Sequence, residues 1–311
     1  MPLTKASYSM ITGAPLNVKD FGAVGDGVAD DTVAINAAMT AAGVGLDTRS
    51  VFFPSGQYKV TDTITVPVAV TVSGNYGSIE HPSVIIWAGN DGTSDVIKFE
   101  TGSDFNENRR SISGLGIITE SSGNLARAAI HANGDQVMVS DCSIQGNSKN
   151  FLFGILGDTR SFSFNMSNNY ISECGVGMYF DHNDITSSLI QRNFVQNCYA
   201  GLVLICPTGV VVQANSFEGG MNYRIVAGNS AAFGGSGLVI AGNYLYGTTG
   251  NTEGILCAKD VTPELGAINT LTGGRLTAAV DITFTPSTTQ FKAIHIHGNP
   301  IIEGPITLRN I

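Results

Sequence analysis

The chain has 311 residues, of which 38 are glycine and only 13% are charged, and its net charge is −9. This acidic balance argues against nucleic-acid binding, which needs clustered Lys and Arg, and no stretch approaches the ~18 apolar residues of a membrane span. Five cysteines without CxxC spacing favour neither a disulfide framework nor a zinc site. The N-terminal residues lack the apolar core of a signal peptide, so we expect a soluble, β-rich protein made in a reducing cytoplasm.

The first notable segment is DFGAVGDGVADDT at residues 20–32, which combines four aspartates with three glycines. A calcium loop of the EF-hand type would need a Glu at its twelfth position, which this spacing does not supply. A kinase DFG would need a Gly-rich loop and an HRD partner, which the chain lacks. We therefore interpret the segment as structural.

The residues that follow are expected to form a helix, VAINAAMTAAG. Asp30 or Asp31 is suited to the N-cap, where a carboxylate also opposes the helix dipole, and Gly43 is a plausible stop. The apolar residues that share one helical face are Ile35, Ala38, Met39 and Ala42.

A repeat of about 25 residues then runs through the chain. Its pattern is an apolar residue, two polar or small residues, an Asn, any residue and an apolar residue. It recurs as VSDCSI (139–144), MSNNYI (166–171), IQRNFV (190–195), VQANSF (212–217), IAGNYL (240–245) and IHGNPI (296–301), with GAINTL (266–271) as a weaker copy. By subtraction, Asn169, Asn193, Asn215, Asn243, Asn269 and Asn299 are separated by 24, 22, 28, 26 and 30 residues.

A second short apolar segment follows each Asn, as in GILGD (154–158), GMYFD (177–181) and GLVLI (201–205). Short β-rich segments with this period predict a parallel β-solenoid, in which stacked coils bury a common core. We expect each Asn to point inward and to hydrogen-bond the Asn of the next coil. Cys174 and Cys198 lie five residues after successive Asn residues, which predicts a stacked pair of buried thiols, with a redox pair as the alternative.

The sequence DFGAVGDGVADDTVAINAA, with VFFPSGQYKV at 51–60, closely resembles the N-terminal signature of pectate-lyase-like right-handed parallel β-helix proteins. The preceding SYSMITGAPLNVKDFGA resembles the neck-to-body junction of bacteriophage tailspikes. The resemblance implies an all-β, right-handed parallel β-helix with an N-terminal capping helix over its open end. It also implies a neck or linker at 1–19, a capping segment with a helix and first strand at 20–60, and a β-helix body at 61–311.

The tailspike resemblance also implies a function. Such proteins are usually homotrimers of the phage tail that bind a bacterial surface polysaccharide, capsule or O-antigen, and many cleave it. We therefore expect a virion component that attaches to the tail or a baseplate adaptor through its N-terminus and acts at the host cell surface. No cofactor, no nucleic acid and no membrane are expected as partners.

Catalytic candidates come from the repeat itself. Asp158 and Asp181 have the same offset on adjacent coils, which would place two carboxylates ~5 Å apart, near the separation in a retaining glycosidase. Such a pair could act as acid and base, or the two residues could simply turn the chain at strand ends. The neighbouring His182, Asp184 and Arg160 are candidates for substrate binding.

Further candidates lie beside the Asn segments. Glu173 and Glu218 are additional carboxylates that could be catalytic. Aromatic residues next to the Asn positions are predicted to face outward: Tyr170, Phe194, Tyr244 and Tyr246. They could form a sugar-binding surface or lie between the subunits of a trimer.

Three functions remain open. Glycosidic hydrolysis ranks first. A receptor-binding spike that binds without cutting is the second, and a polysaccharide lyase is the third. A lyase of the pectate type would need Ca²⁺ and an acidic cluster facing Arg192 or Arg224, which the alignment does not assemble. His295 and His297 are interpreted as surface residues without a third ligand, so no metal site is predicted.

Overall fold

The computed structural model describes residues 13–44, 49–75, 82–101, 110–158, 163–221, 223–228 and 238–245. Beyond these it describes the backbone of strands up to residue 310, and at 182–184 and 206 the backbone alone. The statements below concern these residues.

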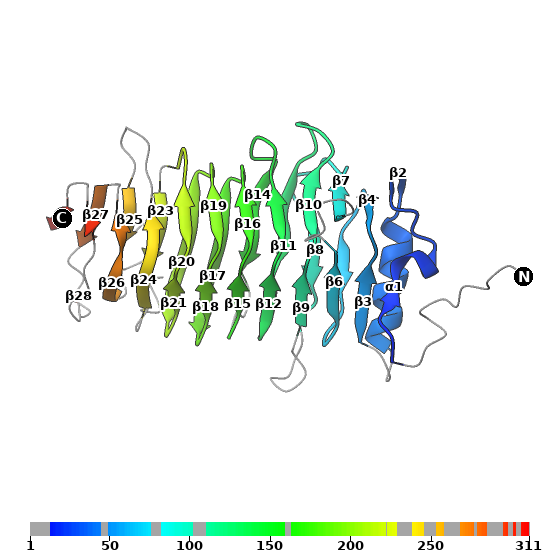
Figure 1. Ribbon diagram of the computed structural model, residues 1–311, viewed down its shortest axis with the longest axis horizontal. Helices are drawn as coiled ribbons and strands as arrows, with labels where there is room; N and C mark the ends of the chain where they lie inside the picture. The colour runs from blue at the N-terminus through cyan, green and yellow to red at the C-terminus, as the bar shows by residue number, and fades with distance from the viewer. Residues whose placement is uncertain are drawn as a thin grey trace, which may run out of the picture.

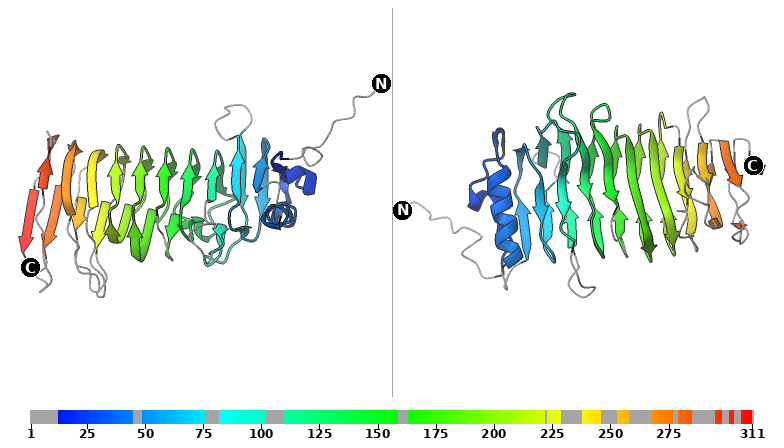
Figure 2. Two further views of the ribbon diagram at one scale, coloured as in Figure 1. Left: turned by 90° about the horizontal axis from the view of Figure 1, so that it is seen from below. Right: turned by 180° about the vertical axis from the view of Figure 1, so that it is seen from behind.

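The chain forms a right-handed parallel β-helix, as predicted, and each full coil contributes three strands to three parallel ladders. Figures 1 and 2 show the coils stacked along the long axis, with the helix α1 (Thr32–Val44) at the N-terminal end. Two of the ladders belong to one 20-stranded sheet, called sheet A, and the third is a 10-stranded sheet, called sheet B.

The strands divide among the ladders as follows. The first ladder of sheet A contains β1 (Leu16–Asn17), β3 (Ser50–Phe53), β6 (Thr71–Gly74), β9 (Arg110–Ser113), β12 (Val137–Ser140), β15 (Asn165–Ser167), β18 (Leu189–Gln191), β21 (Val211–Gln213) and β28 (His295–His297). The second contains β2 (Asp26–Asp30), β4 (Gly56–Val60), β7 (Ser83–Trp87), β10 (Gly116–Thr119), β13 (Ser143–Gln145), β16 (Tyr170–Ser172), β19 (Phe194–Gln196), β22 (Ser216–Glu218) and β29 (Ile301–Ile302). The longer β24 (Leu238–Leu245) and β26 (Ile268–Leu276) take part in both.

Sheet B contains one strand from each coil. These are β5 (Ile64–Val66), β8 (Asp95–Phe99), β11 (Ala126–His131), β14 (Phe151–Gly157), β17 (Val176–Thr186), β20 (Ala200–Thr208), β23 (Tyr223–Gly228), β25 (Glu253–Cys257), β27 (Ala279–Phe284) and β30 (Ile306–Asn310). A short 3-10 helix, η2 (Val18–Phe21), follows β1.

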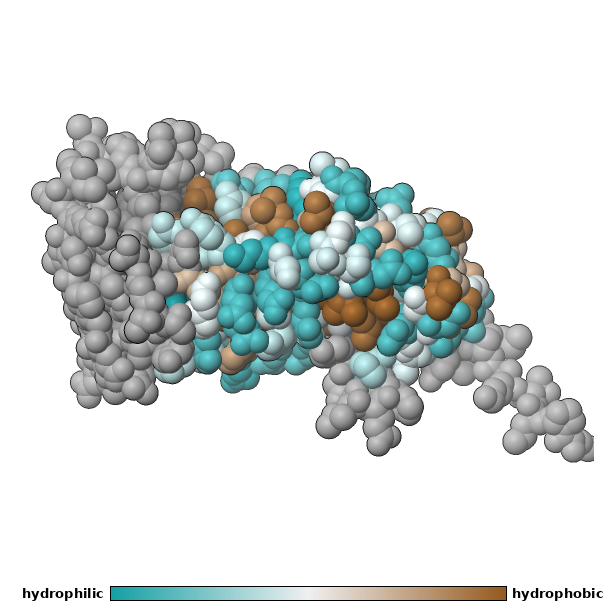
Figure 3. Space-filling view, turned by 90° about the horizontal axis from the view of Figure 1, so that it is seen from above, coloured by the Kyte–Doolittle hydropathy of each residue, from teal (hydrophilic) through white to brown (hydrophobic). Residues whose placement is uncertain are grey.

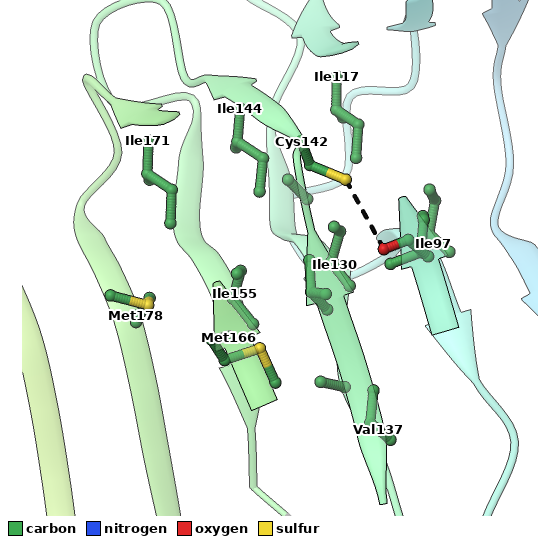
Figure 4. Packing of buried hydrophobic residues seen from close by; sticks show 14 of the residues in the cluster. Ile97, Ile117, Ile130, Val137, Cys142, Ile144, Ile155, Met166, Ile171 and Met178 are labelled. Carbon is green, nitrogen blue, oxygen red and sulfur yellow. Dashed lines mark hydrogen bonds between the residues drawn. The ribbon is translucent and has the colours of Figure 1, made fainter. Parts of the chain in front are cut away.

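The core consists of rows of identical or similar residues, because each coil places the same strand position one step above the last. Ile117 pairs in register with Ile144, and Ile144 with Ile171, and all three are fully buried. Figure 4 shows this row facing a second one that contains Ile130 and Ile155. Residues at the same inward position of successive coils are therefore of the same kind, as the repeat predicted.

The predicted Asn ladder is present. Asn193 Oδ1 accepts hydrogen bonds from the backbone N–H and the Nδ2 of Asn169, both at 3.0 Å. Asn193 Nδ2 donates to the Met166 carbonyl oxygen at 2.9 Å and to Asn215 Oδ1 at 2.9 Å. The same pattern continues to Asn243, and each of these side chains is at most 3% exposed. The ladder satisfies backbone groups that the corner between the two sheet A ladders would otherwise leave buried and unpaired.

The residue before each Asn has a left-handed backbone, which turns the chain from one ladder to the next. Asn168, Arg192 and Ala214 have φ values of 57°, 54° and 53°. This conformation is costly for an alanine or an arginine, so the ladder's hydrogen bonds hold it in place.

The N-terminal cap follows the prediction with one correction. Asp31 precedes the helix, and its carboxylate accepts from the backbone N–H groups of Val24 (2.6 Å) and Gly25 (3.0 Å), while Asp30 accepts from the backbone N–H of Thr32 at 3.0 Å. Asp31 thus holds the loop at Val24 and Gly25, and Asp30 holds the first residue of the helix. Gly43 does not end the helix, which continues to Val44. A side chain at Gly43 would meet Pro67 at 2.8 Å, so this glycine permits the helix to pack on the first coil.

Cys174 and Cys198 are stacked and buried, as predicted. A hydrogen bond with Cys198, together with burial, raises the pKa of the Cys174 thiol. Burial likewise raises the pKa of Cys142 to about 12. The hydrogen bond with Cys174 lowers the pKa of the Cys198 thiol. The raised pKa values mark Cys142 and Cys174 as packing groups, because nucleophilic or redox chemistry needs the thiolate.

We predict that Asn193→Ala destabilises the protein by about 3 kcal/mol, because it removes four hydrogen bonds and leaves buried backbone groups unpaired. Urea unfolding followed by circular dichroism measures the change. Gln191→Ala, on the half-buried outward side of the neighbouring strand, is the control and is expected to change stability by less than about 0.5 kcal/mol. Equal effects of the two substitutions would contradict the structural role of the ladder.

Candidate functional site

Four titratable side chains from three adjacent coils meet on sheet B: Asp95, Arg127, His131 and Asp158, referred to below as the charged cluster. His131 Nδ1 lies 2.7 Å from Asp95 Oδ2, and its Nε2 lies 2.6 Å from Asp158 Oδ1. Arg127 donates to both Asp95 oxygens, through Nε at 2.9 Å and Nη2 at 2.6 Å, and to Asp158 Oδ2 at 3.3 Å. The imidazole is therefore held between two carboxylates, with a guanidinium beside it.

The local fold of sheet B explains how these residues meet. Asp95 begins β8, Arg127 and His131 lie on β11, and Asp158 directly follows β14. Asp95 pairs in register with Ala128, whereas His131 pairs with Lys98. Asp95 and His131 thus occupy register positions three residues apart.

Contact between such positions requires a bend. In a flat strand, residues three apart point to opposite faces and lie about 10 Å apart. A similar contact recurs further along the sheet, where the Phe153 and Tyr179 rings are 5.0 Å apart. Phe153 pairs in register with Ala128, and Tyr179 occupies the same register position as His131, so these two residues are also three positions apart. The strands of sheet B therefore depart from flat geometry here, which brings the two rows of side chains together.

Burial differs sharply within the charged cluster. The side chains of Asp95 and His131 are each 3% exposed, whereas Arg127 is 31% and Asp158 33% exposed. Burial opposes ionisation of Asp95, but hydrogen bonds from His131 and Arg127 and their charges outweigh it, so the pKa of Asp95 lies below its ordinary value. The Asp95 hydrogen bond raises the pKa of Arg127.

The four side chains of the charged cluster differ in their contacts and in how far solvent reaches them. The two ring nitrogens of His131 bridge Asp95 and Asp158, and Arg127 binds both carboxylates and lies 2.7 Å from His131 Nδ1 through its Nη2. Asp158 is the carboxylate that solvent reaches, and His131 and Arg127 hold it from behind. A cavity of about 570 Å³ lies beside the cluster, lined by Thr65, Lys98, Glu100, Thr101 and Asn133.

Two pairs of aromatic side chains follow the charged cluster toward the C-terminus: Phe153 with Tyr179, and Tyr199 with Tyr223. They are called the aromatic pairs below, and they lie at different places along the strands, since Tyr179 pairs in register with Val203. The Tyr199 and Tyr223 rings are 5.8 Å apart, and Tyr199 is 48% exposed. On the face shown in Figure 3 the described surface is mostly hydrophilic, with apolar groups in small separate patches.

The predicted pair Asp158 and Asp181 follows residues that pair in register, since Gly157 pairs with Phe180. Their hydrogen bonds lead in different directions. Asp158 binds His131 and Arg127 of the preceding coil, while the exposed Asp181 accepts from Tyr179 Oη at 2.8 Å. Their use as acid and base stays a prediction.

Glu173 and Glu218 lie away from this pair, on and next to sheet A. Glu173 has φ of 55° in the turn after β16, and its Oε2 accepts from the backbone N–H of Ser148 at 3.1 Å. Glu218 ends β22 and accepts from Ser216 Oγ at 2.6 Å. The structure does not bring either glutamate together with Asp158.

The predicted aromatic surface on sheet A is partly formed. Tyr170 and Phe194 stack at 5.7 Å with a 9° angle between the rings, and Tyr170 Oη binds Gln196. Ser216 separates this pair from Tyr244 in the same ladder. Arg160 and Tyr246 lie outside the described residues, as do the side chains of His182, Asp184, His295 and His297.

Sequence reasoning missed three of the four residues in the charged cluster. His131 lies 36 residues from Asp95 and 27 from Asp158, and the alignment of second strands began one coil too late to include it. Extending that alignment upstream places His131 beside Leu156 and Tyr179, which is a signal that could have found it. Arg224, considered for a lyase, is fully buried and donates to the carbonyl oxygens of Met221 and Gly219.

Residues 16–98 match the family model described as rhamnogalacturonase A/epimerase, pectate lyase-like. This range contains the segment on which the resemblance rested, and it confirms a pectate-lyase-like β-helix. Plasmin and fibronectin-binding protein A of Streptococcus pneumoniae is 37% identical over 82 residues, 24% of this chain and 11% of that protein. Mannuronan C5-epimerase AlgE5 of Azotobacter vinelandii is 56% identical over 45 residues, 14% of this chain and 4% of that protein.

Solved structures extend the likeness of fold to nearly the whole chain. The S. pneumoniae surface protein and adhesin PfbA has a TM-score of 0.55 at 17% identity, covering 96% of this chain and 100% of that chain. The phiAB6 tailspike, solved with oligosaccharides of Acinetobacter baumannii surface polysaccharide, has a TM-score of 0.55 at 15% identity, covering 96% and 49%. The chain spans about a tenth or less of the length of these two curated relatives.

No helix among the described residues is long and apolar enough to cross a membrane. Within the same residues, no group of three or more His, Cys, Asp or Glu is arranged to hold a metal ion.

We predict that the charged cluster makes stability pH-dependent in acid. The pKa of Asp95 is lower in the folded than in the unfolded state, so its contribution is complete above the unfolded value near 3.9 and is lost as pH falls through the folded value. Asp95→Asn should lower the unfolding free energy at pH 7, and the difference from wild type should shrink below about pH 4. Urea unfolding between pH 7 and 3 measures this. Asp62→Asn, in an exposed turn, is the control, and a constant difference for Asp95→Asn would contradict the assignment.

Proposed function

We propose that this protein is a tailspike-like β-helix that binds a bacterial surface polysaccharide on sheet B and cuts it by glycosidic hydrolysis. The observation that carries the proposal is the placement of Asp158, a carboxylate that is 33% exposed and is held by His131 and Arg127 of the preceding coil. Preorganised carboxylates of this kind serve as nucleophile or base in glycoside hydrolysis.

The roles follow from the hydrogen bonds. Asp158 accepts from the Arg127 guanidinium and lies 2.6 Å from His131 Nε2, contacts that fix its orientation, so we assign it the role of nucleophile or of the base that activates water. Asp181, exposed at the equivalent position of the following coil, is the candidate acid that protonates the leaving oxygen. Water adds across the glycosidic bond, and two shorter chains with free hydroxyls result.

His131 and Asp95 are positioning residues in this proposal. They are too buried to touch a sugar, but they fix the direction of the Asp158 carboxylate. Glu218 and Glu173, on and beside sheet A, take no part in the cut.

The phiAB6 tailspike supports the choice of a surface polysaccharide as partner, because that protein was solved in complex with oligosaccharides of a bacterial surface polysaccharide. By the same likeness we propose a homotrimer that forms part of a phage tail and attaches through its N-terminal segment. The stacked Tyr170 and Phe194 on sheet A are then candidates for the contact between subunits.

A second candidate function is binding without cleavage. It is favoured by the charged cluster itself, because each carboxylate already has partners within the chain and the group could serve stability alone. The likeness to an adhesin of the same fold is compatible with it.

The test incubates the purified protein with capsular and O-antigen polysaccharides, reads polymer length by gel filtration and identifies products by mass spectrometry. For a hydrolase we expect fragments that each contain one added water. Asp158→Asn should lower the rate at least 100-fold while binding and thermal stability are retained, and Asp181→Asn should lower it as well.

Glu120→Gln, which breaks an exposed ion pair with Lys59, is the matched control and should cut normally. Fragments that contain a new double bond and no added water would identify a lyase instead. Binding with no change in polymer length would establish the second candidate function.

A further inference from the structure

The outward face of the first ladder of sheet A carries no charged side chain over eight successive described strands. The strands β3, β6, β9, β12, β15, β18, β21 and β24 each place two residues of this ladder outward. Eight strands with two outward residues each give sixteen positions, at which an ordinary protein surface would carry about four or five charges. Arg110 on β9 is fully buried.

The other two ladders carry charges on their outward sides. Lys59 on β4 and Glu218 on β22 belong to the second ladder of sheet A. Lys98 on β8 and Arg127 on β11 belong to sheet B. The absence of charge is therefore a property of the first ladder within the described strands, and not of every face of the β-helix.

The outward residues of this ladder form two rows. One row is mostly apolar, because Met138 pairs in register with Asn165, Asn165 with Leu189, Leu189 with Val211, and Val211 with Val239. Met138 is 43% exposed. This row thus presents apolar surface to solvent along five successive coils.

The second row is polar but uncharged. Ser73, Ser113, Ser140 and Ser167 pair in register along it, and Gln191 and Gln213 continue it with a side-chain hydrogen bond of 3.2 Å. Hydroxyl and amide groups can hydrogen-bond another chain without desolvating a charge.

Charges return at the edges of this face. Arg49 directly precedes β3 at one edge, and Asp141 and Arg192 follow β12 and β18 at the corner with the second ladder, and all three are exposed. A centre without charge inside a charged rim is the composition of a protein–protein interface.

The face is also long and regular. The pairings between its eight strands contain no register shift. Seven coil steps separate β3 from β24, or roughly 34 Å. Figures 1 and 2 show these strands following one another along the stack.

A second copy of this chain is the partner that fits such a face. Each copy has a net charge of −9, so two copies repel each other unless the surfaces that meet are uncharged. The same face of another copy is uncharged and repeats its rows with the same coil spacing, so serine and apolar rows of the two chains match over their whole length. A strongly charged partner would find no ion pair in its centre.

We infer that the outward face of the first ladder is the subunit interface, and that three copies pack these faces around one axis parallel to the stack. The inference rests on the proposed function, in which three N-terminal segments attach to one phage tail and the copies are therefore parallel. Rotation about such an axis keeps each residue at its height, so Met138 of all three copies meet at one level. The contact then lies on the first ladder, around the corner from Tyr170 and Phe194.

Cross-linking locates the interface. Met138→Cys is treated with a short bismaleimide and run on a denaturing gel, with the wild-type chain as background because Cys142, Cys174 and Cys198 are buried. We expect covalent dimers and trimers at least tenfold above that background. Leu152→Cys, on sheet B and 52% exposed, is the matched control and should not exceed the background.

A charge placed on the face tests the same contact without a reagent. Met138→Glu brings three carboxylates to one level, and their repulsion should raise the concentration of half-assembly at least 100-fold in light scattering. Leu152→Glu should assemble as wild type. Both side chains are exposed, and circular dichroism with thermal unfolding verifies that each variant folds.

The remaining outcomes overturn the inference in distinguishable ways. A trimer that cross-links through Tyr170→Cys and not through Met138→Cys would move the interface to the second ladder and leave the homotrimer standing. A wild-type chain that is monomeric at every concentration would overturn both the interface and the homotrimer. Hydrolysis is judged separately, because the polymer-length assay reads cleavage whatever the state of assembly.

Discussion

Hydrogen bonding between successive coils is the constraint on which the rest of this structure depends. Every strand pairs in parallel with the equivalent strand of the next coil, and the Asn ladder repeats that pairing at one corner with side-chain amides. The side chain of Asn193 binds backbone groups of the turn before it and the Asn side chain of the turn after it, and Asn169 and Asn215 follow the same pattern. Because a slip of one residue would move every inward side chain outward, the ladder and the apolar rows reinforce the same register.

Fixed register has a chemical consequence on sheet B. A residue in one coil has defined neighbours one step up and one step down, so charged groups far apart in the chain can be brought within hydrogen-bond distance. The bend of the strands adds contacts between rows three positions apart, which a flat sheet forbids. Asp95, Arg127, His131 and Asp158 meet through these two effects, near the N-terminal end, and the same bend joins Phe153 to Tyr179 further along.

The two kinds of surface divide the proposed work. The charged cluster fixes one accessible carboxylate, Asp158, by hydrogen bonds that need no change in conformation. The aromatic pairs add ring surface on the following coils, where Tyr199 is 48% exposed. Sheet A, by contrast, presents a stacked pair and two glutamates that are each hydrogen-bonded to nearby groups of their own sheet and turns, so it is better suited to contacts between subunits.

The sequence by itself determined the repeat, the inward Asn positions, the stacked cysteines and the aspartates of the N-terminal cap, because all of these depend on local patterns or on equal offsets in successive coils. It also placed Asp158 and Asp181 at equivalent positions. It did not show that Gly43 lies within the helix, since the reason is Pro67 of another element.

Only the tertiary structure decided the site. Asp95, Arg127 and His131 come from coils that the aligned repeat did not reach, and they meet across separations of up to 36 residues. Their contact depends on a bend in sheet B, and no pattern of apolar and polar residues encodes the direction in which a strand bends.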